Sequence, residues 1–196
     1  GEAGQTVAFN VTGNTNAALF SAGPAIAANG TLTYTPAADA NGVATITLVA
    51  QDNGGTANGG VDTSAPQSFT ITVTAVNDRP TLTAANPPTV NEDSGAQSVP
   101  AWATLSPGPA NEAGQAVLSY TVSNVSNAAL FATPPAVANN GTLTYTLAAN
   151  QSGTSTFDVV VRDNGGVANG GIDTSVTSTF TITVTGINDA PSFTAG

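Results

Sequence analysis

The sequence predicts an all-β protein that contains two tandem β-sandwich repeats. Apolar and polar residues alternate with a period of two, as in FTITVT at Phe180–Thr185, and no segment has helical spacing. Asn-Gly pairs, which favour the positive φ angles of tight turns, recur between the alternating segments. Long stretches of the first part of the chain also return later with few changes. Together these features indicate strands, turns and a duplicated unit.

The duplication has a constant spacing over most of its length. NAALF begins at Asn16 and again at Asn127, and DNGG begins at Asp52 and again at Asp163, in each case 111 residues later. A preamble, Thr81–Ala110, precedes the second copy and has no counterpart before the first copy. The two copies are therefore similar in their common part but differ in what comes before it.

We expect the chain to divide into repeats after the proline of each connector, VNDRP at Val76–Pro80 and INDAP at Ile187–Pro191. Residues 1–80 are a first repeat that lacks its N-terminal strand, residues 81–191 are a complete second repeat, and residues 192–196 begin a third. Part of Thr81–Thr104 should form the first edge strand of the second repeat. For the first repeat, truncation and donation of the strand by a neighbouring chain both stay open. Because the chain has no Met, we expect it to be a piece of a longer polypeptide.

The alternating segments of the second copy predict its strands in order. Leu118–Val122, Leu143–Leu147, Phe157–Val161 and Phe180–Val184 each place apolar side chains on one face. About seven short strands in roughly 100 residues favour an immunoglobulin-like sandwich, with a barrel as the lesser alternative. Trp102, in PAWATL, is expected to plug the core or an edge rather than to form a sugar platform.

The composition excludes several classes of function. The chain has twelve Asp and Glu residues and two Arg residues, which gives a net charge of −10, and it contains no Lys, His or Cys. Nucleic acid and anionic lipid need basic residues, so neither is an expected partner. Without His, Cys or Lys there is no imidazole base, thiolate or Schiff base, and we expect no enzyme. No apolar run approaches the ~18 residues that favour membrane insertion. A multivalent cation is the natural partner.

Most of the acidic residues lie at the ends of the predicted strands. Asp163 ends a strand, Asp78 lies in the connector, and Glu112 precedes the first matched strand. In a seven-strand sandwich these positions meet at one end, where carboxylates ~5 Å apart repel by about 3 kcal/mol at an effective dielectric constant of ~20. A hard cation relieves this repulsion, and Ca²⁺ takes oxygen ligands without needing His or Cys.

Several motifs resemble those of cadherin repeats. LVAQDNGG, followed by SFTITVTAVNDRP, resembles the end of such a repeat, with its A-x-D-x-G and final D-x-N-D-N-x-P. NEDSG resembles the early glutamate motif of the family, and NEAGQ falls where the family has D-x-D. The likeness covers nearly the whole chain and is closest to the bacterial cadherin-like repeats of large surface adhesins. It implies two immunoglobulin/cadherin-like Greek-key sandwiches stacked end to end.

The resemblance also implies calcium ligands at three places. They are Asn77, Asp78, Glu112 and Asp163 at the middle junction, Glu92, Asn188 and Asp189 at the far junction, and Glu2 and Asp52 at the near end. The acid that the family has before the connector is replaced here by Thr74 or Ala75, and the D-x-D position keeps one carboxylate. We therefore expect one or two Ca²⁺ ions at each junction rather than three.

The resemblance implies a calcium-stiffened structural or adhesive module of a secreted, multi-repeat cell-surface protein. Its expected partners are neighbouring repeats of the same polypeptide, a cell-surface protein or polysaccharide, and further copies of itself. Two alternatives stay open: a polysaccharide-binding module, and a lateral or head-to-tail subunit of an extracellular filament or sheath. The expected location is extracellular.

Overall fold

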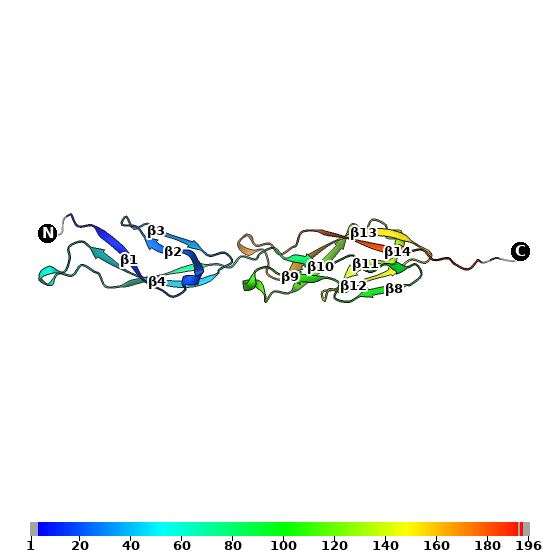
Figure 1. The fold of residues 1–196 in the computed structure, drawn as a ribbon, viewed down its shortest axis with the longest axis horizontal. Coiled ribbons are helices and arrows are strands. Elements are labelled where there is room, and N and C mark those ends of the chain that lie inside the picture. The colour runs from blue at the N-terminus through cyan, green and yellow to red at the C-terminus, as the bar shows by residue number, and fades with distance from the viewer. Residues whose placement is uncertain (1–3, 192, 194–196) are drawn as a thin grey trace. The chain divides into compact units, whose positions relative to one another are not determined.

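The computed structural model describes residues 4–191 and 193 and divides the chain into two compact units. The first unit is Gly1–Ala75 and the second is Val76–Gly196. Both consist of β-strands joined by turns and short 3₁₀ helices, so the predicted all-β class is confirmed (Figure 1). In the part of the chain that the structure describes, no helix is long and apolar enough to cross a membrane.

The second unit is a sandwich of two sheets. One sheet has the strand order β10-β13-β14-β7, and the other has the order β11-β12-β8. All pairs are antiparallel except β14 and β7, which are parallel, and a separate ladder joins β6 to β9. The strands are β6 (Thr81–Thr83), β7 (Val90–Asn91), β8 (Ala96–Val99), β9 (Thr104–Ser106), β10 (Val117–Ser123), β11 (Phe131–Val137), β12 (Leu143–Leu147), β13 (Gly153–Asp163) and β14 (Ser178–Thr185).

The preamble supplies an edge strand to each sheet of the second unit. β7 pairs with the end of β14, and β8 pairs antiparallel with β12. Between them the chain turns at Asp93 and Gly95, whose φ angles are +61° and +67°. The expected edge strand is therefore two short strands, because the chain crosses from one sheet to the other.

The first unit has the same framework with fewer strands. One sheet has the order β1-β4-β5, and the other consists of β2 and β3. Among the described residues of this unit, no segment takes the place of β7 or β8. The strands are β1 (Val7–Asn14), β2 (Phe20–Ile26), β3 (Leu32–Pro36), β4 (Gly42–Asp52) and β5 (Gln67–Val73).

Short 3₁₀ helices occur at matching places in the two units. Asn58 and Asn169 lie within them at φ angles of +56° and +57°, in the left-handed region that Asn tolerates better than most residues. This conformation agrees with the turns that the Asn-Gly pairs predict. The 3₁₀ helices are η1 (Ala17–Leu19), η2 (Ala57–Gly59), η3 (Ala110–Glu112), η4 (Ala128–Leu130) and η5 (Ala168–Gly170).

The core of the second unit lies between its two sheets. Leu143 on β12 and Phe157 on β13 are fully buried in it, on the faces that the alternation predicts. Trp102 closes this core, with its ring edge-on to Phe180 at a centroid distance of 4.8 Å. Its indole Nε1 donates to the carbonyl oxygen of Ala85 at 2.7 Å, which satisfies the one polar atom of the side chain. Trp102 is thus a core plug.

One predicted core position is wrong. Leu118 was expected on the buried face together with Tyr120 and Val122, but it is exposed. The register of β10 against β13 shifts between Val117 and Ser119, which places an extra residue in β10. Such a bulge reverses the side-chain parity on one side of it, because successive residues of a strand point to opposite faces.

The core of the first unit is smaller. Its buried cluster has members on η1, β2, β4 and β5, and none on β3. The whole of β3 is exposed, whereas alternate residues of its counterpart β12 are buried. The buried cluster consists of Leu19, Phe20, Ala44, Ile46 and Ile71.

Candidate cation site at the connector of the second unit

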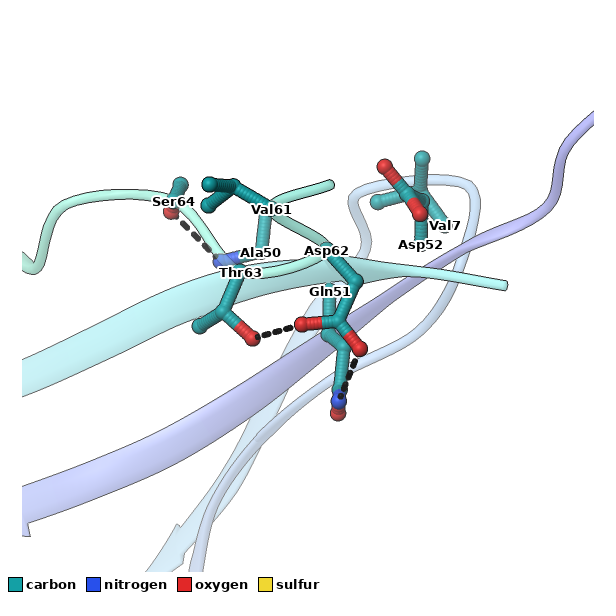
Figure 2. Close-up of a pocket in the computed structure, with 8 residues that line it drawn as sticks. All are labelled: Val7, Ala50, Gln51, Asp52, Val61, Asp62, Thr63 and Ser64. Carbon is teal, nitrogen blue, oxygen red and sulfur yellow. Dashed lines mark hydrogen bonds between the residues drawn. The ribbon is translucent and has the colours of Figure 1, made fainter. Parts of the chain in front are cut away.

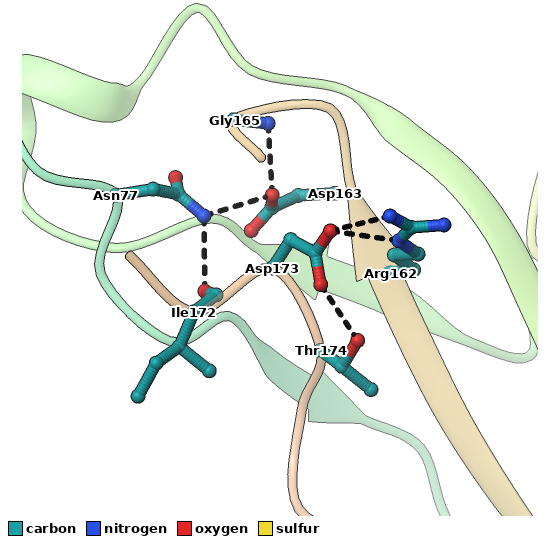
Figure 3. Close-up of polar contacts among 7 residues, drawn as sticks. All are labelled: Asn77, Arg162, Asp163, Gly165, Ile172, Asp173 and Thr174. Atoms are coloured by element: carbon teal, nitrogen blue, oxygen red, sulfur yellow. Dashed lines mark hydrogen bonds and ion pairs between the residues drawn. The ribbon is translucent and has the colours of Figure 1, made fainter. Parts of the chain in front are cut away.

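The connector that opens the second unit is hydrogen-bonded to the loops at one end of the sandwich. The carbonyl oxygen of Asn77 accepts the N–H of Ile172 at 2.9 Å. Its side-chain Nδ2 donates to the carbonyl oxygen of Ile172 at 2.9 Å and to Oδ1 of Asp163 at 3.1 Å (Figure 3). Asn77 is buried as a result. The predicted proximity of Asn77 and Asp163 is therefore present in the structure.

Asp163 is a buried carboxylate at the end of β13. Its side chain is 0% exposed, and Oδ1 also accepts the N–H of Gly165 at 2.9 Å. The other oxygen, Oδ2, has no hydrogen-bond partner among the described residues. The neighbouring Arg162 forms its direct ion pair with Asp173 and interacts with Asp163 only through its charge, as the weakest contribution to the raised pKa of Arg162. A buried carboxylate without a close counter-charge is costly.

Glu112 is a second buried carboxylate, located at the end of η3. Its Oε1 accepts the backbone N–H of Asp78 at 2.8 Å, which ties the connector to this turn. In the described part of the chain, Oε2 is buried without a partner. An added Cβ on Gly108, whose φ is +151°, would lie against this Oε2, so a larger residue there would displace the Glu112 carboxylate. Glu112 and Asp163 therefore each direct one unsatisfied oxygen into the interior.

Gln115 completes the polar network, although it was not among the predicted ligands. Its Nε2 donates to Oδ1 of Asn77 at 2.6 Å, and its Oε1 is buried without a partner among the described residues. A signal was available in the sequence: Gln5 stands at the matching position of EAGQ in the first copy. The predicted ligands are those that the resemblance to cadherin repeats implies, and Gln115 is not among the matched motif positions.

The described residues contain no group of three or more His, Cys, Asp or Glu side chains close enough to hold a metal ion. The carboxylate of Asp78 is exposed, and only its backbone joins the network. A cation at this end would thus depend on amide oxygens as well as on two carboxylates. Such a mixed set of oxygen ligands suits Ca²⁺.

Asp173 lies nearby but is already neutralised. Its Oδ2 accepts Nε of Arg162 at 2.8 Å and is 2.7 Å from the second guanidinium nitrogen (Figure 3). Its Oδ1 accepts the hydroxyl of Thr174 at 2.9 Å. The hydrogen bond from Arg162 lowers the pKa of Asp173, and the bond from Thr174 lowers it further. This acid is therefore a structural ion pair.

The ligands predicted for the far junction are only partly brought together. Glu92 is buried, and its Oε1 accepts the N–H of Ile187 at 2.6 Å. Asn188 and Asp189 follow directly but are exposed, and Nδ2 of Asn188 donates only to the carbonyl oxygen of Asp189, at 3.2 Å. Glu92 thus holds the backbone of the second connector, as Glu112 holds that of the first.

At the near end of the first unit, Asp52 occupies the position that Asp163 has in the second unit. Asp52 is half-buried, and its Oδ1 accepts the N–H of Gly54 at 2.8 Å. A hollow of about 240 Å³ lies beside it, lined by residues that include Val7, Asp52 and Val61 (Figure 2). Glu2, the other ligand predicted for this end, lies outside the described residues.

The comparisons with known proteins agree with this architecture. Residues 2–64 match the family of bacterial Ig domains. A structure of human protocadherin-24 repeats EC1-2 is 17% identical, with a TM-score of 0.61, over 92% of this chain and 82% of that one. Mouse cadherin-23 EC22-24 is 20% identical, with a TM-score of 0.51, over 93% of this chain and 53% of that one.

A third structure is similar over a larger molecule. Mouse protocadherin-24 EC1-3 is 15% identical, with a TM-score of 0.56, and the match covers 92% of this chain and 59% of that one. The chain therefore spans less than two thirds of that structure. At these identities the likeness concerns the fold. No curated protein sequence matches the chain significantly.

Proposed function

We propose that this chain is a structural or adhesive module of bacterial cadherin-like repeats whose junctions are stiffened by calcium. The match of residues 2–64 to bacterial Ig domains and the cadherin-like fold support this proposal. The parent protein is a secreted, multi-repeat cell-surface protein, and the direct partners of each repeat are its neighbours in the same polypeptide. The proposed repeats are residues 1–80 and 81–191, with a third beginning at 192. No catalytic role is proposed.

The observation that carries this proposal is a set of three unsatisfied oxygens around the connector. In the described part of the chain, Oε2 of Glu112, Oε1 of Gln115 and Oδ2 of Asp163 are buried without hydrogen-bond partners. A buried polar atom without a partner costs about 1–3 kcal/mol, and more if it is charged. A cation bound to these oxygens would remove that cost and neutralise two carboxylates at once.

The chemistry of the donors favours Ca²⁺ over other cations. All are carboxylate or amide oxygens, and the chain has no His or Cys to hold a softer metal. Ca²⁺ accepts such oxygens in irregular geometries, whereas Mg²⁺ demands near-octahedral coordination and gives up water reluctantly. Glu112, Asp163 and Gln115 would hold the ion, with Asn77 and Asp78 adjacent. The bound ion would tie the connector to β10 and β13.

The remaining predicted ligands belong to sites that need a neighbouring repeat. Glu92, Asn188 and Asp189 would form the next junction once a following repeat supplies its own glutamate. Glu2 and Asp52 would form the preceding one, with a connector placed beside Asp52. We propose one or two ions at each complete junction.

Titration calorimetry of the whole chain tests the proposal. Chelator-stripped protein titrated with Ca²⁺ should show one site with a dissociation constant of ~0.1–1 mM, the range of extracellular calcium modules. Mg²⁺ should give little heat, and Glu112→Gln, which removes a charge but keeps the shape, should weaken Ca²⁺ binding at least tenfold. The absence of any saturable heat with Ca²⁺ would refute the calcium proposal while leaving the repeat assignment intact.

The alternative function, polysaccharide binding, is not supported by an exposed tryptophan on which a sugar ring could stack. The chain has one tryptophan, and Trp102 is buried against Phe180. Stacking of a sugar ring on an exposed indole is therefore not available. A glycan array probed with the whole chain would decide whether other surfaces bind polysaccharide.

A further inference from the structure

A hollow of about 370 Å³ lies within the second unit, between β9, the start of β10 and the turn that joins β11 to β12. Its volume falls in the ~300–1,000 Å³ range of small-molecule sites. The described residues that line it all come from one part of the chain, residues 103–140, and none of them is charged. We call this space the β9–β10 hollow.

Tyr120 supplies the aromatic wall of the β9–β10 hollow. Its side chain is half-buried and packs against the core of the second unit, and Leu105 and Val117 also line the hollow. Burial raises the pKa of Tyr120, so its phenol stays protonated at neutral pH and can both donate and accept a hydrogen bond. This wall therefore combines an apolar surface with one hydroxyl group.

Two adjacent amides, Asn139 and Asn140, supply further polar groups to the hollow. Nδ2 of Asn139 donates to the carbonyl oxygen of Leu118 at 3.1 Å, and Oδ1 of Asn140 accepts the N–H of Thr142 at 3.1 Å. Each side chain is thus held in place by one of its polar ends. The other ends, an acceptor on Asn139 and a donor on Asn140, are available to a ligand.

The first copy of the repeat differs at two of these positions. Phe9 stands where the second copy has Tyr120, and Ala28 stands where it has Asn139. Phe9 occupies its place in the β1–β4 ladder without a hydroxyl group, as Tyr120 does in the β10–β13 ladder with one. The strand therefore does not need the Tyr120 hydroxyl, and both differences add hydrogen-bonding capacity to one hollow.

The lining chemistry indicates an uncharged ligand that is rich in hydroxyl groups. The net charge of −10 repels anions, and the described lining has no side chain that could pair with a charged group. A sugar ring has apolar C–H groups on one face and hydroxyls around its edge. These features match an aromatic wall beside amide and hydroxyl groups.

We propose that the β9–β10 hollow binds a neutral sugar. The C–H face of the ring packs against Tyr120, and neighbouring hydroxyls donate to Oδ1 of Asn139 and accept from Nδ2 of Asn140. The sugar site gives the alternative function, polysaccharide binding, a specific surface, and it rests on that alternative rather than on calcium. Gln115 lines the hollow and also bonds to Asn77, so the sugar site adjoins the candidate cation site.

NMR titration of the whole chain with cellobiose, lactose and chitobiose tests the proposal. At least one of these neutral disaccharides should bind saturably and shift the side-chain amide signals of Asn139 and Asn140. Glucuronate, an anionic sugar, should cause no saturable shifts. The titrations are run in chelator and repeated with Ca²⁺, so that binding in chelator supports the sugar site whatever the outcome of the calcium experiment.

Matched variants assign the binding to the hollow. Tyr120→Phe and Asn139→Ala introduce the side chains that the first copy has at these positions, so the repeat is expected to accept both. Each should weaken binding about threefold to tenfold, as expected from the loss of one hydrogen bond. Val176→Ala is the control, because Val176 is 62% exposed and does not line the hollow. It should leave binding unchanged, and Trp102 fluorescence checks that all three variants are folded.

Three results would overturn the proposal. The first is the absence of saturable shifts with every neutral disaccharide. The second is saturable binding whose shifts lie away from Tyr120, Asn139 and Asn140, which would place the sugar on another surface. The third is an equal effect of Tyr120→Phe and Val176→Ala on binding. Saturable binding of glucuronate at the same residues would contradict the neutral character of the ligand.

Discussion

The two units of this chain have nearly the same sequence over their common part but very different burial. Leu143 on β12 is completely buried, whereas Leu32, at the same position of β3, is exposed. The local pattern NGTLTYT is identical around both residues. The difference arises from the preamble, which adds β7 and β8 to the second unit and inserts Trp102 into its core. The alternating pattern of a strand thus indicates which side chains can be buried. Whether they are buried depends on the strands that pack beside it.

The two connectors also differ in burial, although their sequences are similar. Asn77 is buried and bonded to Asp163, Ile172 and Gln115. Asn188, in the second connector, is exposed, and its side chain donates to the carbonyl oxygen of the next residue. The same short motif is therefore a structural link in one place and a solvated segment in the other.

The largest expected effect is on the core of the second unit. Leu143→Ala should lower the free energy of unfolding of this unit by about 2–5 kcal/mol, because it leaves a cavity in a closed core. Leu32→Ala should cost the first unit less than about 1 kcal/mol, because Leu32 is already partly hydrated. Urea unfolding followed by Trp102 fluorescence reports the second unit, and calorimetry reports both. Equal losses in the two units would contradict the difference in burial.

The connectors offer a second matched pair. Asn77→Ala should reduce the free energy of unfolding of the second unit by about 1–3 kcal/mol, because Asp163 and the backbone of Ile172 lose buried partners. Asn188→Ala should change it by less than about 0.5 kcal/mol, as exposed substitutions usually do. Denaturant melts of the two variants give both values. A silent Asn77→Ala would show that the network around it contributes nothing to stability.

Calcium provides a sharper comparison of the two units. At a tenfold excess over its dissociation constant, Ca²⁺ should add about 1.4 kcal/mol to the stability of the second unit. Asp163→Asn should abolish this gain, and Asp52→Asn, its counterpart in the first unit, should leave it unchanged. Melting temperatures measured in chelator and in excess Ca²⁺ provide the test. If both variants lose the gain, the ion is not at the proposed site.

The smallest expected effect concerns the ion pair of the second unit. In the second unit Arg162 pairs with Asp173, and at the matching place in the first unit Gln51 donates to Asp62. Arg162→Gln therefore gives the second unit the same type of contact as the first, and Gln51→Arg makes the reverse change. Because Arg162 lowers the pKa of Asp173, the pair stabilises the fold above the unfolded pKa of ~3.9. Its contribution is lost as the pH falls through the lower folded pKa.

Thermal melts across the acid range measure this contribution. Arg162→Gln should therefore be slightly less stable than the unaltered chain at pH 7, and the difference should disappear once the pH is low enough to protonate Asp173. A difference that persists at this low pH would assign the effect of Arg162 to packing of its side chain instead.

Much of the candidate site could be predicted from the positions of acidic residues in the sequence. Asn77, Glu112 and Asp163 were expected at one end of a sandwich, and the structure places them in one hydrogen-bonded network. The role of Gln115 was not predicted, because it is not one of the positions that match the calcium-binding motifs of the cadherin repeats. The ion pair of Asp173 with Arg162 was not predicted either, because it depends on the direction of the Arg162 side chain, which the sequence does not specify.

The sequence by itself determined the all-β class, the duplication and the apolar face of most strands. These depend on local chemistry: alternation sets the two faces of a strand, and Asn and Gly permit the turns. The tertiary structure decided which of those faces are covered. The bulge in β10 exposes Leu118, the preamble splits into edge strands for two sheets, and Trp102 completes one core. Each depends on pairing between segments distant in sequence, which local patterns do not specify.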